Sequence, residues 1–246
     1  MTDPIANHTS AALLPADKAA LLQAALNKSV NGKVVFGAAF AVKHRGATWA
    51  GAAGNLALER PFFIASTTKL FTTARIMQLR AAGALKLDAP ISDHLDADTL
   101  AGLHRYKGKD RSAELTIAHL LAHTSGLPDY FQGKGPGGQS LEHAIKNGHD
   151  EAWSFDQDMA RTKAMSPLFA PGAARKAHYS DANFQLLGRI IERITGRSYA
   201  AECRTHIIEP LGLRSTYLYS DPADTTPQPL HYKANTLHIP QAMASF

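Results

Sequence analysis

A serine and a lysine stand three residues apart in the segment Ser66-Thr67-Thr68-Lys69. Residues with this spacing share a helix face, so the lysine ammonium can stand beside the serine hydroxyl. If burial lowers the pKa of the lysine, its amine can take the hydroxyl proton and leave an alkoxide-like nucleophile. The unpaired N–H groups at the start of a helix also favour the negative charge that develops when a carbonyl is attacked. A capping serine followed one turn later by an exposed lysine explains these four residues equally well.

The element that carries this pair is predicted to be a helix over residues 66–82. Gly83 supplies its stop, and apolar residues recur at helical spacings before it: Leu70, Phe71, Ala74, Met77 and Leu79. A second well-marked helix is predicted over 182–195, where Gly196 ends a run of leucines and isoleucines.

The other predicted elements are shorter. A first helix is predicted over 15–29, followed by strands over 33–43 and 47–54 that a turn at Arg45-Gly46 joins. A last strand is predicted over 215–219. Between about residues 88 and 210 the pattern indicates a helical subdomain of short helices. Its candidate N-caps are Thr116, Ser140, Ser198 and Ser154, the last with Gln157 as a capping box.

Composition excludes several classes of protein. Of the 246 residues, 45% are hydrophobic and 19% are charged, which is typical of a globular domain and argues against disorder, collagen and coiled coil. Without a clear linker or repeat, residues 1–246 are interpreted as a single domain. The lone Cys203 can form no intrachain disulfide and is interpreted as buried. The N-terminus does not resemble a secretory leader, and no apolar run reaches membrane-spanning length, so a cytoplasmic location is predicted.

The formal net charge of +5 suggests a nucleic-acid partner, but the basic residues are spread along the chain. The one dense run, 104–111, is interpreted as a solvated loop, so no nucleic-acid partner is predicted. His119 and His123 are four apart, as metal ligands on one helix face are, but Leu120 stands where His-Glu-x-x-His needs glutamate. Without an evident third ligand or a phosphate loop, no metal and no cofactor are predicted.

Four segments contain further motifs, at residues 62–74, 85–91, 120–130 and 178–196. In order and spacing they resemble the serine hydrolases of the penicillin-binding-protein and class C β-lactamase superfamily. The resemblance implies an α+β fold of the β-lactamase/transpeptidase type, in which an antiparallel sheet packs with helices. It also implies that Ser66 is the acyl-accepting nucleophile, Lys69 its proton partner, and Tyr179 the general base and acid.

The resemblance departs from the family pattern at Asp181, where relatives have the asparagine of Tyr-x-Asn. This position implies contact with the substrate, but an aspartate there could equally hold Lys69 as an ion pair. A tyrosine acts as a base near neutral pH only if neighbouring cations stabilise its phenolate, so Tyr179 beside a lysine suits a proton relay. A rival register aligns Ser180-Asp181 with the class A Ser-Asp-Asn element, but Ala182 occupies its asparagine place. The motif that begins at His123 is predicted to shape a loop.

The family's third element, Lys-Thr-Gly or His-x-Gly, has no counterpart that we recognise. Lys233 is followed by Ala-Asn, His231 by Tyr-Lys and His238 by Ile-Pro, and no glycine follows Gly212. We therefore predict that the chain is truncated at its C-terminus and that its sheet is incomplete. The strand over 34–42 would then expose an apolar edge, which predicts self-association.

These residues favour a serine hydrolase that works through an acyl-enzyme on an ester, a D-amino-acid peptide or a β-lactam amide. The predicted partner is accordingly a small ester, peptide or β-lactam. The alternative is a non-catalytic acyl-binding or interaction module, or an inactive fragment of a longer hydrolase. Covalent labelling of Ser66 discriminates between the two hypotheses.

Overall fold

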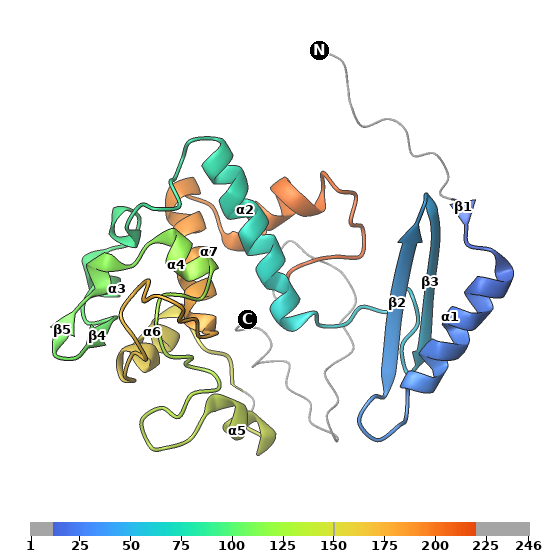
Figure 1. Cartoon of the computed structure of the whole chain (residues 1–246), viewed down its shortest axis with the longest axis horizontal. Coiled ribbons are helices and arrows are strands. Elements are labelled where there is room, and N and C mark those ends of the chain that lie inside the picture. The colour runs from blue at the N-terminus through green and yellow to red at the C-terminus, as the bar shows by residue number, and fades with distance from the viewer. Residues whose placement is uncertain (1–11, 150, 220–246) are drawn as a thin grey trace, which may run out of the picture. The chain divides into compact units, whose positions relative to one another are not determined.

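The computed structural model describes residues 12–149 and 151–219. The chain divides into two compact units. Their described parts are residues 12–62 and residues 63–219 without 150 (Figure 1). The single domain over 1–246 and the C-terminal truncation stay predictions, and Lys233, His231 and His238 lie outside the described residues.

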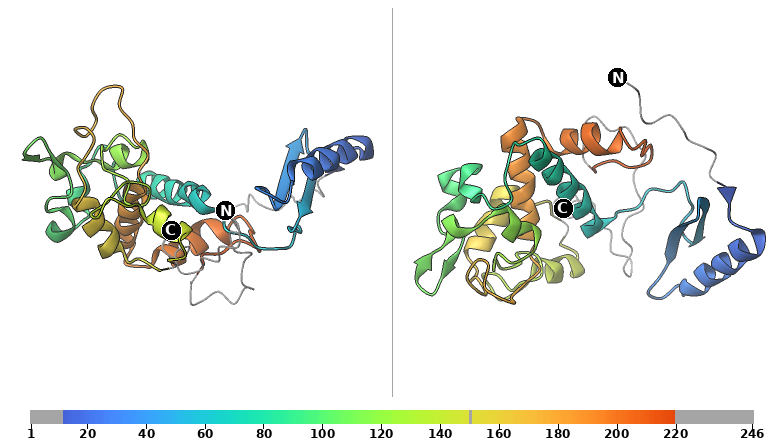
Figure 2. Two further views of the ribbon diagram at one scale, coloured as in Figure 1. Left: turned by 90° about the horizontal axis from the view of Figure 1, so that it is seen from below. Right: turned by 45° about the horizontal axis from the view of Figure 1, so that its top comes forward.

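The first unit is a small sheet with one helix. Strand β2 (Gly37–His44) pairs antiparallel with β3 (Ala47–Gly54), and the short β1 (Ala12–Leu13) pairs parallel with β3, which gives the order β1-β3-β2. Helix α1 (Ala16–Ser29) lies along one face of the β2–β3 ribbon (Figure 2). The predicted helix and hairpin are therefore confirmed within a few residues.

Strand β2 begins at Gly37 rather than at the predicted Lys33. The reason is local, because the Asn31 side-chain oxygen accepts hydrogen bonds from the backbone N–H groups of Lys33, Val34 and Val35 at 2.8–3.1 Å. An asparagine that binds the following backbone in this way holds a turn and withdraws those donors from a ladder.

The second unit is mainly helical. Around the candidate nucleophile and the longest helix it contains η1 (Ala65–Thr68), α2 (Lys69–Ala81), α7 (Asp181–Thr195), α8 (Tyr199–Cys203) and the π-helical turn η4 (Arg204–Ile208). The rest comprises η2 (Ile91–Asp93), α3 (Ala97–Leu100), β4 (Arg105–Tyr106), β5 (Lys109–Asp110), η3 (Ser112–Glu114), α4 (Ile117–Leu121), α5 (Leu141–Lys146) and α6 (Phe155–Lys163).

The core of the second unit forms where α7 packs against α2 and α4 (Figure 1). Leu186, Leu187, Ile190 and Ile191 of α7 are fully buried, as the 3.6-residue period of that segment predicts. Gly196 follows with a φ of 68°, which is the left-handed conformation that ends a helix and that glycine adopts without strain. Packing of α7 therefore fixes the position of the residues that precede and follow this helix.

The predicted N-caps are confirmed. Thr116, Ser140, Ser154 and Ser198 each accept a hydrogen bond from the backbone N–H three residues later, and Ser154 with Gln157 forms the full capping box. The predicted burial of Cys203 is also confirmed. Local hydrogen bonding thus defines where the short helices start.

Two predictions about elements are wrong. Residues 215–219 form no strand, because the N–H of Thr216 bonds to the carbonyl of Leu213 at 3.0 Å in a turn rather than to a partner strand. The run 104–111 is a tight hairpin rather than a loop, with β4 and β5 joined through Lys107 and Gly108 at φ values of 49° and 77°. Within the described part of the chain, no helix is long and apolar enough to cross a membrane.

Candidate active site

Ser66 stands in the single turn of 3₁₀-helix that precedes α2, and not in the first turn of an α-helix as predicted. The N–H of Thr67 bonds to the carbonyl of Ile64 at 3.0 Å, which is the i to i+3 pattern of the tighter helix. Ala65 just before it has a φ of 44°, a left-handed conformation that is uncommon for a residue with a side chain. This bend presents Ser66 as an exposed residue at the start of the helix.

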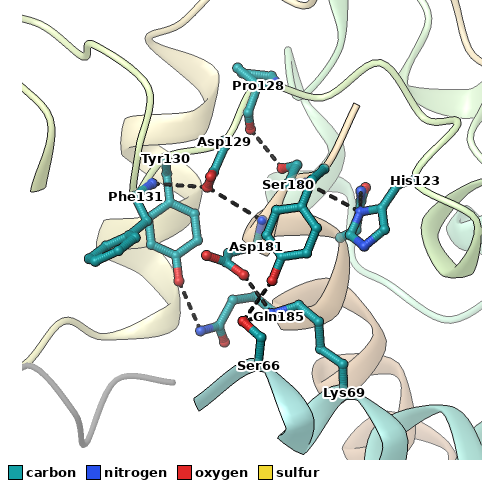
Figure 3. Close-up of polar contacts among 12 residues, drawn as sticks. Ser66, Lys69, His123, Pro128, Asp129, Tyr130, Phe131, Ser180, Asp181 and Gln185 are labelled. Carbon is teal, nitrogen blue, oxygen red and sulfur yellow. Dashed lines mark hydrogen bonds and ion pairs between the residues drawn. The ribbon is translucent and has the colours of Figure 1, made fainter. Parts of the chain in front are cut away.

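Tyr179 meets Ser66 across 113 positions of sequence. The Tyr179 Oη lies 2.7 Å from the Ser66 Oγ, and either hydroxyl can be the donor. The backbone next to it is anchored, because the buried Ser180 donates its hydroxyl to the carbonyl of Pro128 at 2.8 Å (Figure 3). This geometry favours the register that aligns Tyr179, and not Ser180-Asp181, with the family motif.

Lys69 contacts both partners of this pair. Its Nζ donates to the Ser66 Oγ at 3.3 Å and to the Asp181 Oδ1 at 2.6 Å (Figure 3). It also lies 5.0 Å from the centre of the Tyr179 ring. Three of the four predicted site residues therefore surround the ammonium of the fourth. Of the two roles left open for Asp181, the structure contains the ion pair with Lys69.

The charge state of Lys69 differs from the expectation. Burial by itself lowers the pKa of Lys69, but the Asp181 carboxylate and the Tyr179 hydroxyl outweigh burial and raise that pKa above its ordinary value. The ammonium therefore stays protonated at neutral pH. The condition for Lys69 to act as a neutral base, a pKa lowered by burial, is therefore not met, and its cation suits the stabilisation of a phenolate.

His123 lies directly behind Tyr179, a placement that the sequence did not indicate. The two rings stack with their centres 4.6 Å apart. The His123 Nδ1 lies 3.2 Å from the backbone N of Ser180 and 3.0 Å from the Asn183 amide nitrogen. Because a backbone N–H can only donate, this Nδ1 is an acceptor and the ring proton resides on Nε2. Burial, with the nearby Lys69 charge, lowers the pKa of His123 and keeps the ring neutral.

The segment from His123 to Gly126 shapes a loop, as predicted. The N–H of His178 bonds to the carbonyl of His123 at 2.8 Å, and the buried Ser125 hydroxyl donates to the Asn183 side-chain oxygen at 2.7 Å. Gly126 has a φ of 78°, and a Cβ there would come too close to the carbonyl of Phe169. The loop therefore joins the chain before Tyr179 to the first turn of α7.

His119 and His123 make separate contacts in the structure. The His119 Nδ1 accepts from the backbone N–H of Thr116 at 3.2 Å within the cap of α4. His123 lies beyond the end of that helix with a φ of 55°. Among residues 12–149 and 151–219, no group of three histidine, cysteine or acidic side chains could hold a metal ion.

Two further carboxyl groups are buried near the site. Burial raises the pKa of Asp158 to about 7, the Asp181 charge adds to this, and the Tyr130 hydroxyl opposes it. Burial and the Asp181 charge also raise the pKa of Asp129. Tyr130 itself is fully buried and accepts from the Gln185 amide at 3.1 Å (Figure 3). Asp181 is therefore the acidic residue that pairs with Lys69, while its neighbours resist ionisation.

A cavity of about 430 Å³ opens beside Ser66 and Lys69. Residues of η1, α2, α7 and α8 line it, together with the aromatic residues Tyr130, Trp153, Phe155 and Tyr219 from other segments. The candidate nucleophile Ser66 thus contacts Tyr179 and also lines the cavity.

Several known proteins are similar to this chain in sequence, in fold or in both. Esterase EstB of Burkholderia gladioli is 31% identical over 242 residues, which is 94% of this chain and 59% of EstB. Penicillin-binding protein 4* of Bacillus subtilis (strain 168) is 32% identical over 160 residues, which is 65% of this chain and 31% of that protein. The crystal structure of a D-stereospecific amidohydrolase from Streptomyces sp. matches with a TM-score of 0.65 at 35% identity, covering 83% of this chain and 57% of that one. The chain therefore spans less than two thirds of the length of these three relatives.

The family described as Beta-lactamase matches residues 22–243 by its sequence profile. Together with the structural match, this confirms the predicted α+β fold of the β-lactamase/transpeptidase type. The motifs around Ser66 and Tyr179 fall inside the matched range, as does the segment that carries His123. The chain belongs to the beta-lactamase family.

Proposed function

We propose that this chain is a serine hydrolase that cleaves ester or amide bonds through an acyl-enzyme on Ser66. One observation carries the proposal, namely the 2.7 Å contact between the Ser66 Oγ and the Tyr179 Oη with the Lys69 ammonium beside both. A nucleophile within hydrogen-bond reach of a base that a third group holds is the arrangement that covalent acyl transfer requires.

In acylation, the Ser66 Oγ attacks the carbonyl carbon of the substrate while its proton passes to Tyr179, which acts as a phenolate. The Lys69 ammonium stabilises that phenolate, because a nearby positive charge favours the ionised form. The bond from the carbonyl carbon to the leaving oxygen or nitrogen then breaks. Tyr179 returns its proton to the leaving alcohol or amine, and the acyl group stays bound to Ser66 as an ester.

In deacylation, a water molecule takes the place of the leaving group. Its oxygen attacks the acyl carbon while one proton passes to Tyr179, and the bond to the Ser66 Oγ breaks. Tyr179 then returns the proton to Ser66 as the carboxylic acid leaves. One water is consumed, and both side chains recover their starting state.

Asp181 acts in this scheme by positioning Lys69. Its carboxylate lies 2.6 Å from the Lys69 Nζ and its side chain is nine-tenths buried. A carboxylate that is already paired with a buried ammonium holds that charge in place. The substrate contact that the resemblance implies at this position stays a prediction.

The relatives support the bond classes of the proposal. EstB is named as an esterase, the Streptomyces protein as a D-stereospecific amidohydrolase, and the Bacillus subtilis protein as a penicillin-binding protein. We therefore propose small esters, D-amino-acid amides or peptides and β-lactams as the substrates to test. The shared chemistry is attack by a serine hydroxyl on an ester or amide carbonyl.

Intact-mass spectrometry tests the proposal directly. The purified chain is incubated with a fluorophosphonate and, separately, with a penicillin, and the adduct is located by peptide mapping. We expect one adduct on Ser66 that a Ser66→Ala variant lacks. A Ser140→Ala variant, which removes a hydroxyl outside the cavity, should label like the wild type.

Two results would contradict the proposal. An adduct that persists in Ser66→Ala would place the reactive group elsewhere. The absence of any adduct on a sample that is folded by circular dichroism would favour the alternative of a non-catalytic acyl-binding module.

A further inference from the structure

The long helix α7 contains one glycine in its interior, Gly188. Glycine weakens a helix because it loses more backbone freedom on folding than other residues do, so an interior glycine calls for a reason. Its φ is not positive, and the one atom that a Cβ would meet is Tyr199 Cδ2 at 3.9 Å, an ordinary contact. Neither the backbone nor the neighbouring helix therefore requires glycine here.

Gly188 lines the same cavity as Ser66. Residues four apart lie above one another on a helix, so Phe184, Gly188 and Glu192 form one row along the cavity side of α7, and all three line it. Side chains on a helix lean toward its N-terminus, so any side chain at 188 would extend toward Phe184 and the Lys69–Asp181 pair. The missing side chain thus leaves space in the part of the cavity that leads to the nucleophile.

Aromatic side chains form part of the wall of this cavity. Phe155 and Phe184 line it together with Trp153 and Tyr199. The charged residues beside them are paired with each other, because the Arg189 guanidinium donates to Glu192 at 3.2 Å and lies 4.3 Å from the centre of the Phe155 ring. Aromatic rings, and charged residues that are already paired with each other, favour an uncharged, apolar group of a ligand.

Ser66 indicates which part of a substrate enters this space. In the proposed mechanism the acyl carbon becomes bonded to the Ser66 Oγ, whereas the leaving group departs with a proton from Tyr179. Ser66 and Lys69 line the cavity. A group attached to the acyl carbon therefore extends from Ser66 into the cavity.

We infer that the space left open by Gly188 is the subsite for the acyl group, and that it selects acyl groups ending in an aromatic ring. The inference rests on the proposed function for the assignment to the acyl side. Gly188 is then the specificity-determining residue, because the absence of its side chain sets the depth of the subsite.

The test compares two esters with the same leaving group, p-nitrophenyl acetate and p-nitrophenyl 3-phenylpropanoate. A Gly188→Leu variant should lower kcat/KM for the phenylpropanoate by about 10-fold to 100-fold and change that for the acetate by less than about 3-fold. Gly188→Ala should give a smaller loss in the same direction. Ala160→Leu, which adds a leucine to an exposed position of α6 outside the cavity, should leave both values unchanged.

Retained acetate hydrolysis shows that the Gly188→Leu variant is folded. An unchanged ratio between the two esters, or an equal loss for both, would overturn the inference.

Failure of the proposed function gives a different result, namely an unreactive Ser66 in the mass-spectrometric experiment. Calorimetric titration with 3-phenylpropanoate then tests the subsite without catalysis. Binding to the wild type and Ala160→Leu that Gly188→Leu loses would support the subsite, and no difference between Gly188→Leu and the wild type would overturn it.

Discussion

At the scale of single residues, two opposing effects set the charge of Lys69. Burial penalises the ammonium, while the Asp181 carboxylate 2.6 Å away and the Tyr179 hydroxyl together outweigh burial and raise the pKa of Lys69. Burial raises the pKa of two neighbouring carboxyl groups, Asp129 and Asp158, so both resist ionisation more than an exposed aspartate does. Lys69 thus keeps its proton because one carboxylate of the cluster is paired with it.

Replacing Asp181 by asparagine should shift the alkaline limb of the pH–rate profile. Without its partner, burial would dominate and lower the pKa of Lys69, so the ammonium would lose its proton at a lower pH. We expect the alkaline limb of kcat/KM to move down by about one pH unit or more. An Asp156→Asn variant, in which an exposed carboxylate of α6 is removed, should keep the wild-type profile. An unmoved limb in Asp181→Asn would contradict the positioning role.

His123 should matter through the placement of Tyr179. Its Nδ1 accepts from the backbone N–H of Ser180 and its ring stacks on Tyr179 at 4.6 Å. A His123→Phe variant keeps an aromatic ring but removes the acceptor, so the tyrosine hydroxyl should shift relative to Ser66. We expect kcat to fall by about 10-fold to 100-fold with KM little changed.

His143→Phe, which alters an exposed histidine of α5, serves as the control for that measurement. The acid limb adds a second measurement. Since burial lowers the pKa of His123, its protonation should reduce activity of the wild type only below its ordinary pKa. Retention of full activity and of the same acid limb by His123→Phe would exclude a role for this ring.

At the scale of elements, α2 is attached to α8 by a buried ion pair. The Arg75 guanidinium donates to Glu202 at 2.7 Å, and the two side chains are 10% and 1% exposed. Thr72 of α2 also meets the hydroxyl of Tyr199 at 2.7 Å. These contacts hold the helix that carries Lys69 against the helix that lines the cavity.

Removing one member of this ion pair should lower the stability of the folded chain. Arg75→Met leaves the Glu202 carboxylate buried, and the described cations nearest to it are then Arg197 and His206, at 3.5 and 3.6 Å. We expect the free energy of unfolding in urea to fall by about 3 kcal/mol. Replacing both residues, as Arg75→Met with Glu202→Leu, should recover most of that loss because no unpaired charge remains. A double variant as unstable as the single one would contradict this account.

The limits of prediction are clearest at this scale. Helix α7 and the caps of the short helices were predictable, since an apolar period and a capping hydrogen bond are local. The strand over 215–219 was not, because a strand depends on a distant partner for its hydrogen bonds. The 3₁₀ turn at Ser66 was not predicted either. Ala65 has a left-handed conformation, and alanine is not a residue type that indicates this conformation in a sequence.

At the scale of the whole molecule, buried Asp158 should make stability depend on pH. In the folded chain its pKa is raised to about 7 by burial, whereas an exposed aspartate titrates near 3.9, so unfolding releases a proton between about pH 4 and 7. This contribution to stability is therefore present at low pH and is lost as the pH rises through that range. An Asp158→Asn variant lacks this contribution. The unfolding free energy of the variant minus that of the wild type should therefore rise by roughly a few kcal/mol between pH 4 and pH 8. Urea titrations at both pH values measure this, and a pH-independent difference would contradict it.

Self-association through a sheet edge also belongs to this scale, and it stays a prediction. In the described sheet, β2 pairs on one side with β3 and has no further described strand beside it. Phe40 of β2 is 55% exposed. If the edge associates, Phe40→Lys should shift the sedimentation coefficient toward that of the monomer, because a charge on an edge strand opposes pairing. An unchanged coefficient, with an associating wild type, would place the contact elsewhere.

The sequence alone predicted most of the elements and the family, together with Ser66 as the candidate nucleophile and Tyr179 as its candidate base. Helical period and capping act within a few residues, and motif order and spacing are properties of the chain itself. The tertiary structure decided what surrounds them. It paired Lys69 with Asp181 over 112 positions, placed His123 behind Tyr179 and left Gly188 beside an aromatic cavity. These relations come from the packing of distant segments, and the charge of a buried group depends on that packing more than on its neighbours in sequence.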